Sequence, residues 1–240
     1  MHRYLNVLAA LVTGIGSLVV YAQRSGAQEN PVTAIDIALE PDATMIQHAE
    51  AANARLLKVF PKGFALDATH HPHISILQRY VRTADLDKVY AAAGKVLSDE
   101  KVASWKLKAS KYYYIPWKDI GLGGIVVEPT DDLLRLQQEL IDAVAPFTEK
   151  TGTAAAYVTT PADPEINQPT IDYVAAFVPK ETGKNFNPHV TIGVAPQDYL
   201  KEMLAEPFDV FTFSPAGASV YQLGNFGTAR KELKAWDLKP

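Results

Sequence analysis

Hydrophobic and polar positions follow two different periodicities along the chain, and these periodicities predict its helices and strands. In residues 41–60 apolar side chains recur at helical spacing, and Pro61 ends the pattern. The segment HISILQRYV, which starts at His73, alternates instead and is rich in β-forming residues, so it predicts a strand. A further helical stripe occupies residues 83–97.

The second half of the chain contains both patterns again. Residues 104–117 and 122–129 predict two strands, with a flexible turn at the glycines of GLGG, and residues 131–147 predict a helix with a buried stripe. The segments TAAAYVTT and PHVTIGVA predict further strands. Short helices are expected on both sides of PHVTIGVA, in IDYVAAFVPKE and PQDYLKEML. The chain is expected to close with strands in DVFTFSPAGASVYQLG and ELKAWDL.

The order of these elements predicts an α+β protein with two related halves. Each of the two strands that begin with Pro-His is preceded by a helix and followed by a helix, and then by further strands. One folded domain is expected to occupy residues 41–240. Residues 28–40 show no clear pattern and are predicted to be an irregular lead-in.

The N-terminus has the pattern of a secretory signal peptide. Arg3 precedes an apolar run from Leu5 to Tyr21, and small residues suited to cleavage follow it. Residues 1–27 are therefore predicted to be removed on export to the periplasm or the medium, which would leave no stable membrane association. The alternative is an uncleaved membrane anchor, because the run is at the short limit for a membrane span.

Composition and charge narrow the classes of function. The chain has no cysteine, so a disulfide, a thiolate nucleophile and a cysteine-based zinc site are all excluded. Its formal net charge is −4, and residues 1–27 contain two arginines and no acid, so their removal gives −4 − 2 = −6. An acidic surface is poorly suited to binding long nucleic acid. A small phosphate-bearing ligand remains compatible with this charge, and the protein is expected to be a monomer.

One short motif occurs twice, as HISI from His73 and as HVTI from His189, each time directly after a proline. Residues i and i+2 of a strand point to the same face. Each strand therefore presents an imidazole and a hydroxyl, that of Ser75 or Thr191, to one side and two apolar side chains to the other. If the two strands face each other, two imidazoles and two hydroxyls form one site.

This set of groups suits phosphodiester chemistry. One histidine can take a proton from water and the other can give a proton to the leaving alkoxide, because the pKa of imidazole lies near neutral pH. The hydroxyls can donate hydrogen bonds to the non-bridging phosphate oxygens. The scheme needs neither a metal nor another cofactor. The sequence leaves open which histidine is the base.

The two motifs, with their contexts PHISILQ and FNPHVTIG and the late segment VYQLGNFG, resemble the 2H phosphoesterase superfamily, which includes the RNA 2′,3′-cyclic phosphodiesterases, also called the 2′-5′ RNA ligase family. The resemblance implies a bilobal α+β fold with two antiparallel sheets, flanking helices and a central groove. It implies that His73 and His189 are the acid–base pair and that Ser75 and Thr191 bind phosphate. By the same resemblance Tyr221 runs beside the groove and is a candidate contact for a base.

The implied reaction is metal-independent hydrolysis of a cyclic phosphodiester, either a 2′,3′-cyclic nucleotide or the cyclic phosphate at an RNA end, and by microscopic reversibility the same groups could also catalyse ligation. Two alternatives stay open. One is a binding module that holds a phosphate ligand without turnover. The other is a metal-dependent hydrolase built on His71, His73 and His189, since clustered histidines bind zinc. The aromatic run Tyr112-Tyr113-Tyr114, with Trp117, is either part of a half-buried strand with aromatic core residues or a stacking surface for a base.

Overall fold

The computed structural model describes residues 31–161 and 163–238. The predicted signal peptide, residues 1–27, lies outside this part of the chain, so it stays a prediction. No helix within the described part is both long and apolar enough to cross a membrane.

The described chain forms five α-helices and nine β-strands joined by short loops and 3₁₀ turns. In chain order these are β1 (Val32–Pro41), α1 (Ala43–Val59), β2 (Ile74–Arg82), α2 (Leu86–Asp99), β3 (Leu107–Trp117), β4 (Ile120–Val127), α3 (Asp131–Val144), β5 (Thr148–Glu149), α4 (Gln168–Lys180), β6 (His189–Pro196), α5 (Gln197–Ala205), β7 (Phe211–Phe213), β8 (Pro215–Leu223) and β9 (Ala229–Asp237).

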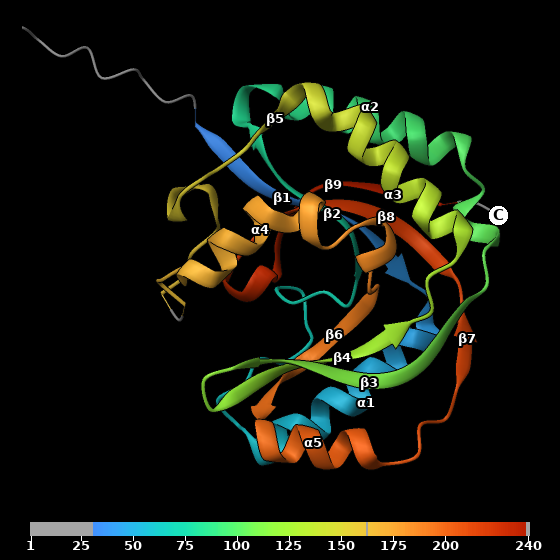
Figure 1. The fold of residues 1–240 in the computed structure, drawn as a ribbon, viewed down its shortest axis with the longest axis vertical. Coiled ribbons are helices and arrows are strands. Elements are labelled where there is room, and N and C mark those ends of the chain that lie inside the picture. The colour runs from blue at the N-terminus through green and yellow to red at the C-terminus, as the bar shows by residue number, and fades with distance from the viewer. Residues whose placement is uncertain (1–30, 162, 239–240) are drawn as a thin grey trace, which may run out of the picture.

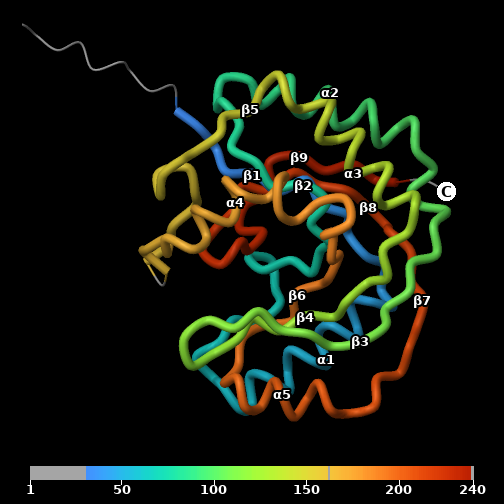
Figure 2. Tube along the Cα trace, in the orientation of Figure 1, coloured from blue at the N-terminus to red at the C-terminus, as the bar shows by residue number. Residues whose placement is uncertain are grey.

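The strands form one curled antiparallel sheet in the order β7-β3-β4-β6-β2-β1-β8-β9, with β5 paired to β2 (Figure 1). Helices α1 and α5 pack on the half that contains β6, and α3 packs on the half that contains β2, with α2 against α3. Figure 2 shows these two helix pairs at opposite ends of the molecule. The α+β class, with antiparallel strands and flanking helices in two halves, is confirmed.

The two predicted sheets are joined into one sheet by a single pair of residues. Strands β2 and β6 are the middle strands, and they share one paired position, Ile74 with Val190. On either side of that pair the strands separate, because each follows its own half of the curled sheet. The two histidine motifs lie at this junction.

Strand β1 corrects the prediction for residues 28–40. Residues 32–41 form a strand between β2 and β8, in the middle of one half of the sheet. Seven consecutive residues of this strand, 33–39, are buried. A strand that is buried on both faces has no alternation of polar and apolar residues, so the pattern that identifies half-buried strands is missing.

Two smaller predictions also differ from the structure. The segment TAAAYVTT forms a 3₁₀ turn at Ala154–Ala156 rather than a strand. The glycines of GLGG lie inside strand β4 rather than in a flexible turn. An alanine or valine at Gly124 would place its Cβ 2.5 Å from a ring carbon of Tyr113, so the missing side chain makes room for that ring.

The apolar residues of the two motifs are buried as the strand pattern predicts. Ile74, Ile76, Val190 and Ile192 are at most 1% exposed and belong to one hydrophobic cluster that extends through both halves. Their burial fixes the register of β2 and β6, because a slip of one residue would turn these side chains to the other face. The histidines and hydroxyls are therefore held on the opposite face.

Candidate active site

All four residues of the predicted site line one cavity. His73, Ser75, His189 and Thr191 border a cavity of about 500 Å³ between the two halves of the sheet. The antiparallel register around the Ile74–Val190 pair sets His73 beside Thr191 and Ser75 beside His189. Each imidazole is thus next to the hydroxyl of the other motif.

Two oxygen neighbours of His73 favour its protonated form. Its Nδ1 lies 2.6 Å from the carbonyl oxygen of His71 and its Nε2 lies 3.5 Å from Oδ2 of Asp36. A carbonyl only accepts, so Nδ1 carries a hydrogen. A neutral ring would then direct the Nε2 lone pair at the carboxylate. An imidazolium instead presents N–H groups to both oxygens, which is the favourable arrangement.

The pKa of His73 follows from the same neighbours. Burial acts to lower the pKa of the imidazole, but the hydrogen bond and charge of Asp36 raise it, and the net pKa lies above the ordinary value for histidine. Asp36 is fully buried in β1, so its charge is not shielded by direct contact with solvent.

Asp36 also organises Ser75 and Gln78. The Ser75 hydroxyl donates a short hydrogen bond to Oδ2 of Asp36, and the Gln78 side-chain amide donates to the same oxygen at 3.0 Å. The hydrogen of the Ser75 hydroxyl is therefore directed at the carboxylate. A phosphate in the cavity would meet the oxygen of Ser75 rather than its hydrogen.

His189 has the opposite environment. Its Nδ1 lies 2.8 Å from the carbonyl oxygen of Asn187, which leaves Nε2 with a free lone pair. The ring of Tyr113 packs edge-on against it, with centroids 4.7 Å apart. Burial lowers the pKa of His189, and the positive charge of His73 lowers it further, so the pKa lies below the ordinary value.

Tyr221 does not reach the cavity. Its side chain is fully buried, its hydroxyl donates a 2.6 Å hydrogen bond to Glu40, and its ring lies 6.0 Å from that of His73. The prediction that Tyr221 contacts a base is therefore wrong. A residue in β8 next to β1 packs behind His73, because one further strand separates it from the groove.

Two residues of the aromatic run, whose role the sequence leaves open, line the cavity. Tyr113 and Trp117 border it, whereas the ring of Tyr112 packs edge-on against Phe208, with centroids 4.9 Å apart. In strand β3 residues i and i+2 share a face, so Tyr113 and Trp117 point to one side and Tyr112 to the other. Phe226, from the turn after β8, also lines the cavity and meets Trp117 edge-on at 4.9 Å.

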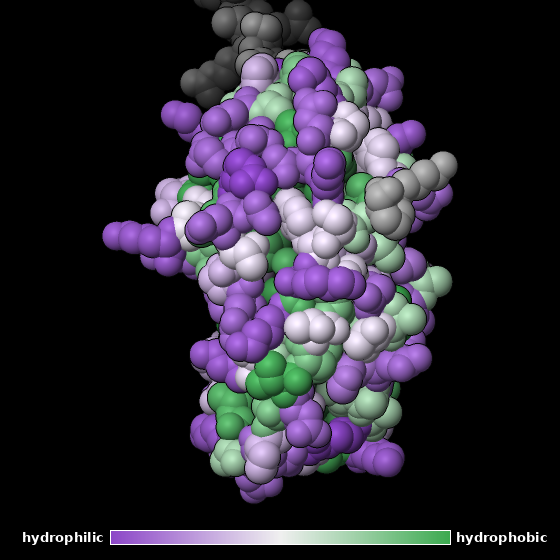
Figure 3. All heavy atoms as spheres, turned by 90° about the vertical axis from the view of Figure 1, so that its right-hand side faces the viewer, coloured by the Kyte–Doolittle hydropathy of each residue, from purple (hydrophilic) through white to green (hydrophobic). Residues whose placement is uncertain are grey.

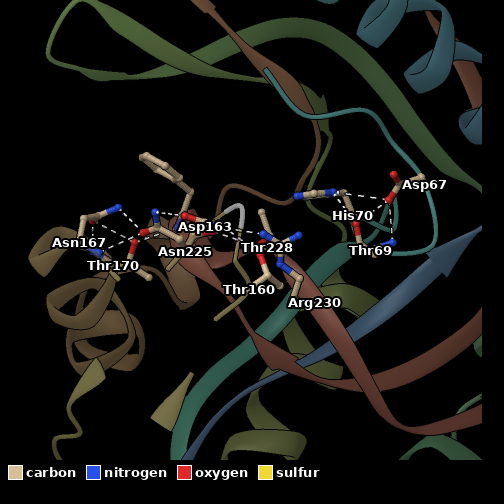
Figure 4. A network of polar contacts seen from close by, with 11 residues as sticks. Asp67, Thr69, His70, Thr160, Asp163, Asn167, Thr170, Asn225, Thr228 and Arg230 are labelled. Carbon is tan, nitrogen blue, oxygen red and sulfur yellow. Dashed lines mark hydrogen bonds and ion pairs between the residues drawn. The ribbon is translucent and has the colours of Figure 1, made fainter. Parts of the chain in front are cut away.

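A polar network fixes the segment that carries Phe226 (Figure 4). Oδ1 of Asn225 accepts hydrogen bonds from the backbone and side-chain N–H groups of Asn167, at 3.0 and 2.6 Å. The backbone N–H of Phe226 donates to the Thr170 hydroxyl at 3.0 Å. This segment is thereby tied to the first turn of α4, and Phe226 is held with a positive φ of 58°.

The structure does not support the histidine-cluster metal site. His71 stacks on Tyr221 with ring centroids 5.6 Å apart. Within residues 31–161 and 163–238, no group of three or more histidine, aspartate or glutamate side chains lies close enough together to bind a metal ion.

Asp36 and Gln78 were not identified from the sequence. Asp36 is a single acidic residue within the apolar run VTAIDIAL, and that isolation was the available signal, since buried charges are kept only where they are paired. Gln78 gave no signal, because its contact with Asp36 depends on the pairing of β1 with β2.

The curled antiparallel sheet with its flanking helices is a fold that this chain shares with solved structures of other proteins. The solved structure of TT0787 from Thermus thermophilus superimposes on it with a TM-score of 0.52 at 15% sequence identity, over 86% of this chain and 98% of TT0787.

Two other solved structures are similar at greater distance. E. coli LigT complexed with NADP+ has a TM-score of 0.42 and 14% identity, over 88% of this chain and all of LigT. Usb1 from Kluyveromyces marxianus has a TM-score of 0.40 and 10% identity, over 88% of this chain and 99% of Usb1. No family model matches the sequence, and no curated protein matches it.

Proposed function

We propose that this protein is a metal-independent phosphodiesterase that hydrolyses a cyclic phosphodiester, such as a 2′,3′-cyclic phosphate, to a monoester. The observation that supports this function best is the pair of motif histidines in one cavity with opposite protonation preferences. A pair of titratable groups whose environments separate their pKa values can serve as base and acid at one pH. Neither role is needed for binding alone.

The environments of the two histidines assign their roles in this proposal. Nε2 of His189 takes a proton from water as the water oxygen attacks phosphorus. The bond from phosphorus to one ester oxygen breaks, and the protonated His73 gives its Nε2 proton to that leaving oxygen as this N–H turns from Asp36, 3.5 Å away, to the substrate. Ligation uses the same groups when the hydroxyl of a second molecule replaces water: His189 takes the proton of that hydroxyl, and His73 protonates the same leaving oxygen. Charge on the non-bridging oxygens is balanced by the His73 imidazolium and by the Thr191 hydroxyl.

The proposed role of Ser75 differs from that of Thr191. Because the Ser75 hydroxyl donates to Asp36, it orients the carboxylate that keeps His73 protonated. Ser75 would bind phosphate as a donor only after its hydroxyl rotates away from Asp36. Thr191 is therefore the principal hydroxyl donor to the substrate phosphate.

The test of this function is turnover of the four nucleoside 2′,3′-cyclic phosphates by residues 28–240 in EDTA, with 2′- and 3′-monophosphates separated by chromatography. We expect turnover by the unchanged chain, and a loss of at least about 100-fold in His73→Ala and in His189→Ala. Full activity in either variant would contradict the role of that histidine. Binding without turnover would indicate a binding module.

A second substrate distinguishes the acid from the base. A 4-nitrophenyl phosphodiester has a leaving group that departs without a proton. His73→Ala should lose much less activity on this substrate than on the cyclic phosphates, whereas His189→Ala should lose as much on both. The reverse result would exchange the two roles.

The proposal includes export and a monomeric state. Export is supported only by the pattern of residues 1–27. Mass spectrometry of the protein from its native host should find an N-terminus near residue 28, and sedimentation should give the mass of one chain. An intact N-terminus in a membrane fraction would favour the anchor instead.

A further inference from the structure

The twenty described residues that line the cavity around the two histidines include no lysine and no arginine. Apart from the two histidines and the tyrosines, the one ionisable side chain among these twenty is the carboxylate of Glu181, at the end of α4. Proteins that bind several phosphate groups usually supply arginine or lysine to each, since these side chains form charge-assisted hydrogen bonds with phosphate.

The described residues of the cavity offer an anionic ligand one positively charged side chain. The His73 imidazolium carries a single positive charge, and it already faces Asp36. Glu181 adds a negative charge near Tyr113 and Tyr173. Burial raises the pKa values of both phenols most, and the Glu181 carboxylate contributes to each increase. A second phosphate in the cavity would meet Glu181 with no cation beside it, and like charges at short range repel strongly in a partly dry cavity.

Much of the cavity wall consists of apolar side chains and aromatic rings. Half of the twenty lining residues are apolar or aromatic, and six carry aromatic rings besides the histidines. These six are Tyr113, Trp117, Tyr173, Phe177, Phe186 and Phe226. Rings of this kind stack on a nucleobase whatever its identity, and they also accept other apolar groups.

The size of the cavity suits one such group. Its volume of about 500 Å³ is in the range of sites that hold a small ligand. Trp117, at the tip of the β3–β4 hairpin, touches Phe226, which the network of Figure 4 holds against α4. These two rings join the two halves across the cavity, so they leave less room for a chain that continues beyond the first nucleoside.

We infer that the site selects small substrates whose only charge is the phosphodiester that reacts and that carry one aromatic or apolar substituent. A nucleoside 2′,3′-cyclic monophosphate fits this description. An RNA end or a nucleotide with a further phosphate does not, although each can carry the same cyclic group. This inference rests on the proposed function for the identity of the reacting group.

Binding to an inactive variant tests this selectivity separately from turnover. Calorimetry would measure the Kd values of three ligands for the His189→Ala variant of residues 28–240, with His189→Gln as a second variant. The ligands are adenosine 2′,3′-cyclic phosphate, its 5′-phosphorylated form, and the dinucleotide ApA that ends in a 2′,3′-cyclic phosphate. Circular dichroism would check that each variant is folded.

We expect the cyclic mononucleotide to bind at least about 10-fold more tightly than either ligand with a second phosphate, and the difference to shrink at high salt. Glu181→Gln, added to the same variant, should reduce this ratio. Equal or tighter binding of the phosphorylated ligands, or no binding of the mononucleotide, would overturn the inference. Failure of the unchanged chain to turn over any of the three would overturn the proposed function instead.

Discussion

The two motif histidines differ chiefly in one neighbour, the carboxylate of Asp36. Both rings use Nδ1 to donate to a backbone carbonyl two residues earlier, that of His71 or Asn187. Only His73 also has a carboxylate at its Nε2. Two motifs with nearly the same sequence thereby acquire opposite protonation preferences, because the third group comes from a different strand.

Replacement of Asp36 by asparagine should lower the pKa of His73, since burial would remain and the opposing negative charge would be lost. We expect kcat/KM on a 2′,3′-cyclic nucleotide to fall by about 10-fold to 100-fold, and the alkaline limb of its pH profile to move to lower pH. The matched control is Gln78→Met, which removes a donor to Asp36 and keeps the charge. An alkaline limb that stays in place in Asp36→Asn would contradict the role of this carboxylate.

The unchanged protein should show a bell-shaped pH profile of kcat/KM. The acidic limb should reflect His189, which must be neutral and whose pKa is lowered, so activity rises as pH increases through a value below 6.5. The alkaline limb should reflect His73, which must be protonated and whose pKa is raised, so activity falls as pH increases through a value above 6.5. A profile whose two limbs both lie below pH 6.5 would contradict this order.

At the scale of the elements, two helices make equivalent hydrogen bonds to the two motif strands. The carbonyl of Ile192, the fourth residue of the second motif, accepts a 2.9 Å hydrogen bond from Asn53 in α1. The carbonyl of Ile76, the fourth residue of the first motif, accepts a 3.0 Å hydrogen bond from Gln137 in α3. Both amides are buried. This correspondence supports two related halves, and it satisfies carbonyls that face no partner strand where β2 and β6 separate.

Gln137→Leu should therefore lower the free energy of unfolding by about 1–3 kcal/mol, because it leaves the buried Ile76 carbonyl without a donor. Asn53→Leu should cost more, since Asn53 makes two further bonds, to the backbone of Phe64 and Leu66, whereas Gln137 makes one, from the N–H of Gly183. Urea unfolding measures both. The control is Gln138→Leu on the exposed face of α3, for which a change within about 0.5 kcal/mol is expected. A similar loss at Gln138 would show that the helix, not the carbonyl, is affected.

Strand β6 depends on a glycine just after its motif. Gly193 has a φ of +126°, and a Cβ there would lie 2.8 Å from Nδ2 of Asn53. Gly193→Ala should cost about 1–3 kcal/mol from the backbone alone. The matched variant is Gly183→Ala, at a φ of +59° with no atom within 4 Å, which should cost only about 1 kcal/mol. Urea unfolding that ranks Gly183→Ala as the more harmful change would contradict this account.

In the whole molecule, the two halves share one hydrophobic cluster. It contains Leu136 and Leu140 of α3 and also Leu200 and Met203 of α5, at opposite ends of the fold. The surface in Figure 3 is mostly hydrophilic, with only small areas of hydrophobic side chains. The prediction of a monomer is untested, and the face in this view offers no extended apolar surface for a partner.

A continuous core should make the two halves unfold together. Trp117 lies in β3 and Trp236 in β9, so their fluorescence reports on different halves. Two variants would each keep one of these tryptophans and lack the other one and Trp105. Circular dichroism measures the overall stability of each variant. After correction for that stability, we expect the urea transitions that fluorescence reports to have the same midpoint in both variants. Two separate transitions within one variant would show that the halves are independent domains.

The sequence by itself determined which four motif side chains share a face of their strands, and most of the elements. The repeated motifs identified His73, His189, Ser75 and Thr191, because strand periodicity is a local property that sets which side chains share a face. The same locality explains the correct helices and the α+β class. It also explains the missed strand β1, whose burial on both faces removes the local pattern.

Only the tertiary structure decided which histidine is held protonated, which aromatic residues line the cavity, and that Tyr221 lies behind the site. Each of these depends on pairing between segments far apart in the chain. Asp36 reaches Ser75 through the β1–β2 register, and Trp117 reaches Phe226 across the cavity. The pKa of a group depends on distances to charges and on burial, and neither quantity is encoded in the local sequence.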